Sequence, residues 1–296
     1  MEKTLRRQLM NHVLLAALCF LFLSCQRRPS SQFASATAHA EEPTVAASHR
    51  ETDETTFSDG ELTQEDFDRV TPDASKTTEK TMLLKRYSYV TAYNPETRCP
   101  AWVGWTLTAA HTDGPYPRLK KFLEDKDVPQ PRALYSDIRE SRCGYQRGHM
   151  CPAADNKWAE QAQHDAFLMT NICPQDGDLN QNDWEELEEK CRDWAKAYGK
   201  VHIVAGPIFI HQPRRTVGEN HVAVPDAFFK VVLVGEGSNA KAIGFFYENE
   251  DGRHPMSHYV RSVDEIEDFT RLDFFHHLDD ETENRIEARS DLRDWR

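Results

Sequence analysis

Residues 180–208 read NQNDWEELEEKCRDWAKAYGKVHIVAGPI, a helical pattern that passes directly into a strand pattern. In the first part, apolar side chains recur at intervals of three and four residues and Gly199 follows, which predicts a helix from Asn180 to Tyr198. The second part, residues 202–208, is a short apolar run with Gly and Pro, which favours a strand. This stretch therefore predicts a fold that contains both helices and strands.

Four further stretches favour strands. Residues 87–93 and 102–108 alternate with a period of two, whereas residues 228–234 and 242–247 are short apolar runs. Strands in runs, with helices placed irregularly between them, indicate an α+β fold rather than a regular alternation of strand and helix. We therefore expect a mixed or antiparallel central sheet with flanking helices.

One polar residue interrupts the apolar stripe of the predicted helix. The apolar side chains lie within about 40° of one direction, and Asn180 projects onto the same stripe. A buried amide needs a hydrogen-bond partner. Asn180 is therefore either a cap or a partner for a loop backbone, or a residue that addresses an ion or a catalytic water. Glu188 lies at the edge of the stripe, and Arg192 lies one turn further on the same side.

A second motif, GYQRGHMCP, occupies residues 144–152. Gly148 would let the backbone approach a ligand closely, Arg147 carries a forked donor suited to phosphate, and His149 is a natural general base near neutral pH. The alternative interpretation is a core histidine beside a surface arginine.

With these two motifs and several others, the chain resembles the DNA/RNA non-specific endonuclease family, which has a ββα-metal (His-Me finger) active site. The stretch around residues 144–155 is most similar to exported versions from Bacteroides-like bacteria. The resemblance covers about residues 85–275. The matching residues are Asn94-Pro95, Trp102-Val103-Gly104-Trp105, Gln146-Arg147-Gly148-His149, Thr170-Asn171-Ile172-Cys173-Pro174-Gln175, Leu179-Asn180, Trp184, Leu187-Glu188, Gly206-Pro207, Val224-Pro225, Phe228-Phe229-Lys230 and residues 262–267.

The resemblance implies a metal-dependent endonuclease that hydrolyses the phosphodiester bonds of DNA and RNA to 5′-phosphorylated products. It implies that His149 is the general base and that Asn180 is the single direct protein ligand of Mg²⁺, with Mn²⁺ or another divalent cation as alternatives. A cation that keeps most of its water suits one amide ligand. Glu188 would hold metal-bound waters.

The resemblance also implies roles around the phosphate. Arg147 and Arg192 would neutralise the scissile phosphate, and Asn171 would belong to the substrate-binding group and support the site. Lys120 takes the position of an additional phosphate-binding arginine of the family, with Arg118 and Lys121 as neighbours.

The chain departs from the family at Gln146, where an aspartate is usual. An amide can preserve hydrogen bonds but not charge. One alternative follows from this departure, a catalytically weakened nucleic-acid-binding lipoprotein. A separate alternative is a phosphodiesterase that acts on another phosphoester.

Composition limits the classes of partner. The 296 residues include 36 basic and 49 acidic side chains, a net charge of −13. This balance excludes a generic basic nucleic-acid coat protein. Residues 81–296 carry −9 of that charge, because residues 1–25 contribute +2 and residues 26–80 contribute −6. We therefore expect weak, salt-sensitive general affinity for DNA and RNA, with binding confined to one cleft.

The N-terminus is typical of an export signal. Residues 1–25 combine a basic start with an apolar run at 13–23, which is too short to cross a hydrocarbon core of about 30 Å. Phe22-Leu23-Ser24-Cys25 resembles a lipobox with Cys25 as the lipidated residue, and the alternative is cleavage after Ala38-His39-Ala40. We expect an exported protein, either an outer-membrane or cell-surface lipoprotein held by a lipid anchor or a periplasmic or secreted form, with no obligate protein partner.

Composition also divides the chain. Residues 26–80 are rich in Ser, Thr and acidic residues and predict a flexible tether, residues 81–280 predict the nuclease domain, and residues 281–296 predict a charged tail with a solvated helix.

Five cysteines lie in the domain. Disulfides are the default in an exported chain, and an odd number leaves one thiol free. A zinc site built from Cys143, Cys151, Cys173 and His149 is the weaker alternative, because no C-x-x-C pair is present.

Overall fold

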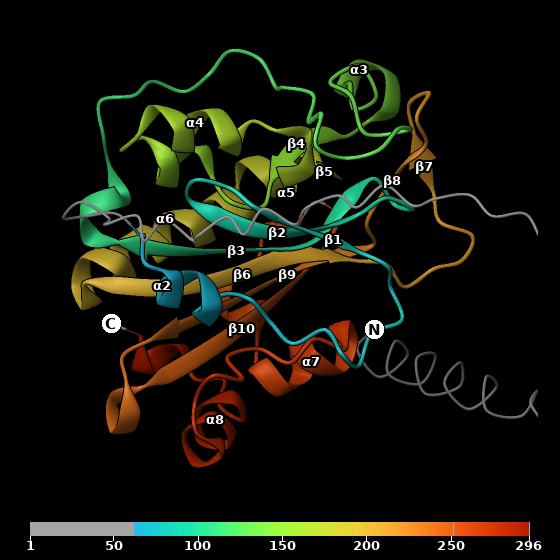
Figure 1. Cartoon of the computed structure of the whole chain (residues 1–296). Coiled ribbons are helices and arrows are strands. Elements are labelled where there is room, and N and C mark those ends of the chain that lie inside the picture. The colour runs from blue at the N-terminus through green and yellow to red at the C-terminus, as the bar shows by residue number, and fades with distance from the viewer. Residues whose placement is uncertain (1–61, 251, 296) are drawn as a thin grey trace, which may run out of the picture. The chain divides into compact units, whose positions relative to one another are not determined.

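The computed structural model describes residues 62–250 and 252–295. At its centre lies a seven-stranded sheet in the order β1-β2-β3-β6-β9-β10-β11, with every neighbouring pair antiparallel (Figure 1). This confirms the predicted α+β class. The strands of this sheet are β1 (Met82–Lys85), β2 (Tyr89–Asn94), β3 (Cys99–Thr108), β6 (Lys200–Ile208), β9 (Ala227–Val234), β10 (Lys241–Glu248) and β11 (Val260–Arg261).

The five predicted strands correspond to β2, β3, β6, β9 and β10. Two smaller pairs lie outside the main sheet, one formed by β4 (Gln146–His149) and β5 (Ile172–Gln175), the other by β7 (Thr216–Val217) and β8 (Val222–Ala223). The helices are α2 (Gln64–Arg69), α3 (Glu140–Cys143), α4 (Glu160–Ala166), α5 (Gly177–Gln181), α6 (Asp183–Tyr198), α7 (Val263–Thr270) and α8 (Asp280–Glu287).

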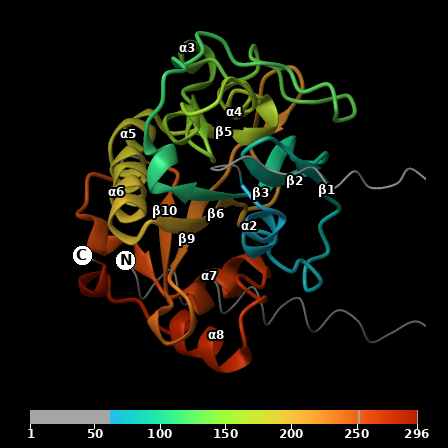
Figure 2. The same cartoon turned by 60° about the vertical axis from the view of Figure 1, so that its left-hand side comes forward.

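Helices cover both faces of the main sheet. The helices α5 and α6 and the β4–β5 pair lie on one side, and α7 and α8 lie on the other (Figures 1 and 2). Each side has its own apolar core, with Trp184 and Trp194 in the first and Phe67, Phe229 and Phe274 in the second. Because neither face is open to solvent, β2 and β9 are buried at every residue.

The folded domain begins before the predicted boundary at residue 80. A capping box between Thr63 and Asp66 starts α2, and Leu62, Phe67 and Val70 are buried against the sheet. The prediction of a flexible tether is therefore wrong for residues 62–80, where three apolar side chains suffice to dock a short helix. The signal peptide, Cys25 and the rest of the tether lie outside the described residues.

The C-terminal tail is also part of the domain. The expected helix is present as α8, but Ile286 is buried in the second core and Trp295 in the first. Trp295 packs against Trp194 of α6 with ring centroids 4.7 Å apart and the rings tilted by 54°. The prediction of a solvated tail is therefore wrong, because two apolar side chains anchor this charged segment.

The helix predicted from Asn180 to Tyr198 is broken. At Asn182 the backbone leaves the helical region (φ −125°, ψ −90°), which separates α5 from α6. Asp176 caps α5 by accepting hydrogen bonds from the Asp178 and Leu179 amides. Asn180 therefore lies on its own short helix, and its position relative to α6 is set by the break rather than by a continuous helical stripe.

Within the described part of the chain, none of the helices has the length and apolar composition needed to span a membrane. The cysteines at 99, 143, 151, 173 and 191 are all free thiols, so the expectation of disulfides in the domain is wrong in this structure. The zinc alternative is not supported either, because the group of potential metal ligands found among the described residues contains none of these cysteines.

Candidate active site

The β4–β5 pair and the helices after it form a ββα motif. In the antiparallel register His149 lies opposite Ile172, and Gln146 lies opposite Gln175. The indole Nε1 of Trp184, on α6, donates a hydrogen bond to the backbone carbonyl oxygen of His149 at 3.3 Å. This bond joins α6 to the strand that carries His149. The ββα motif therefore contains Gln146, His149, Asn180 and Glu188.

Gly148 is required by packing. A Cβ atom at this position would lie 2.0 Å from Oε1 of the Gln175 side chain on the paired strand. Gln175 is completely buried. We expected the glycine to admit a ligand, whereas the structure shows that it admits the side chain of Gln175.

His149 presents a neutral imidazole. Its ring packs against Phe122 and Phe167, with both centroid distances at 5.1 Å, and only 6% of the residue is exposed. Burial, with a smaller contribution from the charge of Arg118, lowers the pKa of His149 to about 3. Its Nε2 atom has no hydrogen-bond partner among the described residues. The ring is therefore uncharged at neutral pH.

The amides of Gln146 and Asn180 orient each other. The Asn180 Nδ2 group donates to Oε1 of Gln146 at 2.8 Å, and the Gln146 Nε2 group donates to Oε1 of Glu140 at 3.0 Å. Because the Glu140 carboxylate can only accept, it fixes which end of the Gln146 amide faces Asn180. The Asn180 Oδ1 atom, the one that can bind a cation, is thereby turned away from Gln146.

Asn171 stabilises the backbone beside the histidine. Its Oδ1 accepts from the Cys151 amide at 2.9 Å, and its Nδ2 donates to the carbonyl oxygens of Cys151 and Ala166, both at 2.9 Å. The residue is 0% exposed. The expectation that Asn171 supports the site agrees with these bonds, but its assignment to the substrate-binding group is wrong, because a fully enclosed side chain with all three bonds made to the backbone cannot reach a substrate.

Aromatic rings hold Arg147 in place. Its guanidinium lies 4.3 Å from the centroid of the Tyr135 ring and 5.1 Å from that of Phe122, which also contacts His149. Nη1 donates a hydrogen bond to the carbonyl oxygen of Ile138. Arg147 is thus a half-buried cation whose position is fixed close to the histidine ring.

Arg192 forms a buried ion pair that the sequence did not reveal. Its Nη1 lies 3.0 Å from Oδ1 of Asp155, whose side chain has no exposed surface. The other carboxylate oxygen of Asp155 accepts from Nε1 of Trp105 at 3.1 Å. Arg192 therefore has a structural partner in addition to any phosphate it binds.

Glu188 and Lys230 belong to the same charged group. Burial raises the pKa of Glu188 to about 7, against the opposing charges of Lys230 and Arg192. Lys230, on β9, is 0% exposed, and its Nζ lies 4.3 Å from the centroid of the Trp184 ring. Sequence reasoning included Lys230 only as one position of the resemblance. The signal that could have identified it is a lysine inside an otherwise apolar strand, since a lysine is almost never fully buried without a counter-charge.

Arg118, a neighbour of Lys120 on an exposed loop, contributes to the electrostatics of the histidine. Its guanidinium lies 5.3 Å from the centroid of the Phe167 ring, and its charge acts on His149. Lys120 is exposed on the same loop. Arg118 was noted only as a neighbour of Lys120, because the loop between residues 113 and 122 has no secondary structure that fixes an alignment.

The chain matches known nucleases over this whole region. Residues 68–281 match the family model described as DNA/RNA non-specific endonuclease. Mitochondrial endonuclease G of Bos taurus is 34% identical over 199 residues, which are 62% of this chain and 66% of that protein. Nuclease C1 of Cunninghamella echinulata var. echinulata is 35% identical over 212 residues, 66% of this chain and 83% of that protein.

A solved structure agrees with the fold. The crystal structure of the EndoG/EndoGI complex, which concerns the mechanism of EndoG inhibition, superimposes with a TM-score of 0.63 and 25% identity. The match covers 69% of this chain and 89% of that chain. The family match spans well over half of the sequence and includes every element of the ββα motif. The chain therefore belongs to the DNA/RNA non-specific endonuclease family.

Proposed function

We propose that the protein is an endonuclease that hydrolyses phosphodiester bonds of DNA and RNA without sequence preference and leaves 5′-phosphorylated fragments. The observation that carries this proposal is the uncharged His149 imidazole in the same ββα motif as an Asn180 amide that Gln146 and Glu140 orient. Family membership supports the reaction class.

In this mechanism His149 takes the proton of the attacking water. An uncharged imidazole can act as a general base when a water lies within hydrogen-bonding distance of a ring nitrogen. Arg147, held against the Tyr135 and Phe122 rings, is placed to neutralise phosphate charge. Arg118 provides a second cation beside the histidine. These contacts recognise phosphate rather than base, which accounts for the lack of sequence preference.

The residues fit a hard divalent cation. Asn180 offers a free amide oxygen, and Glu188 offers a carboxylate in the same motif. When bound, Mg²⁺ or Mn²⁺ would supply charge stabilisation for the phosphate and the leaving oxygen. Asn180 would hold the cation directly, and Glu188 would bond to its waters.

The Gln146 departure does not remove the interaction that we expect of this position. Its Oε1 accepts from Asn180 as a carboxylate oxygen would. This observation favours an active enzyme over a silenced nucleic-acid-binding protein.

The test is digestion of plasmid DNA and of total RNA by the purified chain, with Mg²⁺ and with EDTA, beside His149→Ala and Asn180→Ala. His258→Ala, which removes an exposed histidine outside the ββα motif, is the matched control. We expect cutting of both substrates that EDTA and the first two variants abolish and the control retains. Binding without cutting by folded protein, across several divalent cations, would instead identify a silenced binding protein.

We also propose that the chain is exported and anchored through a lipid on Cys25, on the basis of residues 1–25. Expression of the chain and of Cys25→Ser, followed by separation of membrane and soluble fractions, tests this. We expect the cysteine variant to leave the membrane fraction. A chain found in the cytoplasm would contradict export.

A further inference from the structure

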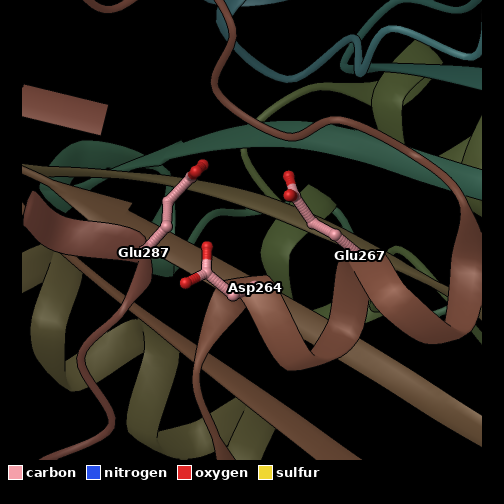
Figure 3. A group of neighbouring side chains, drawn as sticks. All are labelled: Asp264, Glu267 and Glu287. Atoms are coloured by element: carbon pink, nitrogen blue, oxygen red, sulfur yellow. The ribbon is translucent and has the colours of Figure 1, made fainter. Parts of the chain in front are cut away.

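Helices α7 and α8 carry an acidic cluster on the face of the sheet opposite the ββα motif. Asp264 and Glu267 lie on α7, and Glu287 is the last residue of α8. Each residue offers a carboxylate oxygen, and these three oxygens all lie within 4.8 Å of one another. Figure 3 shows the three side chains reaching from the two helices toward a common space.

Glu287 makes this cluster more than a group of surface acids. The residue is only 4% exposed, and its Oε1 atom has no hydrogen-bond partner within the described structure. Burying a carboxylate without a partner is energetically costly, so such a group either takes up a proton or binds a cation. Its carboxylate lies on the same side of the two helices as those of Asp264 and Glu267, and the three groups form the corners of a triangle (Figure 3).

The surroundings supply further negative charge. Glu283 on α8 and Asp273 on the preceding loop both act on Glu287 with the same sign as Asp264 and Glu267. The nearby cation, Lys76, is 3.0 Å from Asp273 and is exposed. Burial, together with the neighbouring carboxylates, raises the pKa of Glu287 to about 9.

Hydrogen bonds to the backbone fix two charged side chains of these helices. The Arg285 guanidinium on α8 donates to the carbonyl oxygens of Ala240 and Gly237, away from the cluster. The Glu267 Oε1 atom accepts from the Phe274 amide at 2.8 Å. That bond fixes the Glu267 carboxylate and leaves its second oxygen for the cluster.

We propose that Asp264, Glu267 and Glu287 form a second divalent-cation site, of the calcium type, that is separate from the active site. Oxygens that lie within 4.8 Å of one another are close enough to share one divalent cation. Ca²⁺ binds six to eight oxygen ligands in flexible geometry, whereas Mg²⁺ demands a near-octahedral arrangement, so Ca²⁺ is the ion to test. Asp264 is exposed, which leaves the ion open to solvent water for its remaining ligands.

Such an ion ties the end of the chain to the domain. Asp264 and Glu267 follow β11 directly, whereas Glu287 precedes the segment that carries Trp295 into the core. Binding would therefore stabilise the contact between α7 and α8 and leave the ββα motif unchanged.

The experiment uses the full chain with Asn180→Ala, so that the active-site cation does not contribute. Thermal unfolding and isothermal titration with CaCl₂ after EDTA treatment are measured for this parent, and for Glu287→Gln and Glu267→Gln made in it. Asp268→Asn, on the same helix and outside the three-residue cluster, is the matched control. We expect one Ca²⁺ per chain in the parent and the control. In the two glutamine variants we expect at least a tenfold loss of affinity.

The glutamine variants also report on folding. Without calcium, Glu287→Gln removes a buried carboxylate, so we expect its midpoint temperature to equal or exceed that of the parent. A parent that binds no calcium at millimolar concentration would overturn the proposal, and a stabilising Glu287→Gln in that case would assign a shared proton to the cluster. Unchanged calcium binding by Glu287→Gln would overturn it as well.

Discussion

Replacing Gln146 tests whether this residue sets the orientation of Asn180. Gln146→Leu keeps most of the side-chain volume but removes the acceptor that lies 2.8 Å from Asn180 Nδ2. The Asn180 amide is then free to rotate, and its oxygen no longer faces one direction. Since the proposed cation binds to that oxygen, the variant should weaken cation binding more than it weakens the fold.

The magnitude follows from the bond that is lost. A hydrogen bond between neutral amides contributes about 1 kcal/mol net, and loss of an outer-shell partner of a metal ligand reduces affinity by about 10–100-fold. We therefore expect the Mg²⁺ concentration for half-maximal cutting to rise about tenfold in Gln146→Leu, with a smaller change in the rate at saturating Mg²⁺.

A second replacement, Gln146→Glu, distinguishes the effect of the hydrogen-bond acceptor from the effect of a negative charge at this position. Gln146→Glu retains an oxygen for Asn180, but it places a carboxylate at the contact where Nε2 now lies 3.0 Å from Glu140. Two unit charges at this distance in water repel by about 1 kcal/mol. Glu140→Gln in the same chain removes that repulsion, so the double variant should cut at least as well as the parent.

The assay is plasmid nicking across a Mg²⁺ series, with thermal unfolding of each variant as the control for folding. If Gln146→Leu unfolds at the parent temperature and requires the same Mg²⁺ concentration, Gln146 does not position the cation ligand, and our explanation of the departure from the family is wrong.

Three further predictions concern other parts of the domain. Burial, with a smaller effect of the Arg69 charge, lowers the pKa of His202 to about 3. The stability that the neutral ring contributes is therefore complete above the unfolded pKa of about 6.5 and is lost as the pH falls, by about 2 kcal/mol at pH 5. Urea unfolding of His202→Gln should lack this part of the loss. Gly148→Ala should destabilise the domain by about 1–3 kcal/mol through its clash with Gln175, measured by urea unfolding, and recovery on adding Gln175→Ala would identify the clash as the cause. Arg118→Ala should reduce DNA cutting about tenfold, the loss of one charge-assisted phosphate contact, whereas the same rate assay should show less than a twofold change for Lys120→Ala; equal losses would contradict the placement of Arg118.

The main strands and the long helix could be predicted because their apolar patterns extend over many residues. The strand β4 could not, since its four residues, Gln146–His149, are three polar side chains and a glycine and carry no alternating apolar pattern. Its pairing with β5 joins segments more than twenty residues apart, and only the ordered family resemblance indicated that they meet.

The helix break shows a second limit of the pattern. Asn180 falls on the apolar stripe only if the helix is continuous, and the backbone at Asn182 is not helical. The conclusion that Asn180 needs a polar partner is correct, but it was drawn from a continuous apolar stripe that the break at Asn182 interrupts. The partner itself, Gln146, comes from a strand 34 residues earlier, which helical periodicity cannot show.

The net charge of the domain does not indicate where nucleic acid would bind. The acidic excess of the domain includes the cluster of Asp264, Glu267 and Glu287 on the α7–α8 side of the sheet, whereas Arg118 and Arg147 lie beside His149 on the other side. A polyanion is repelled by the first face and attracted by the second, so the sheet separates the two charges. The same separation predicts that occupation of the acidic cluster by a cation changes the stability of the C-terminal segment and leaves the face that carries the ββα motif unchanged.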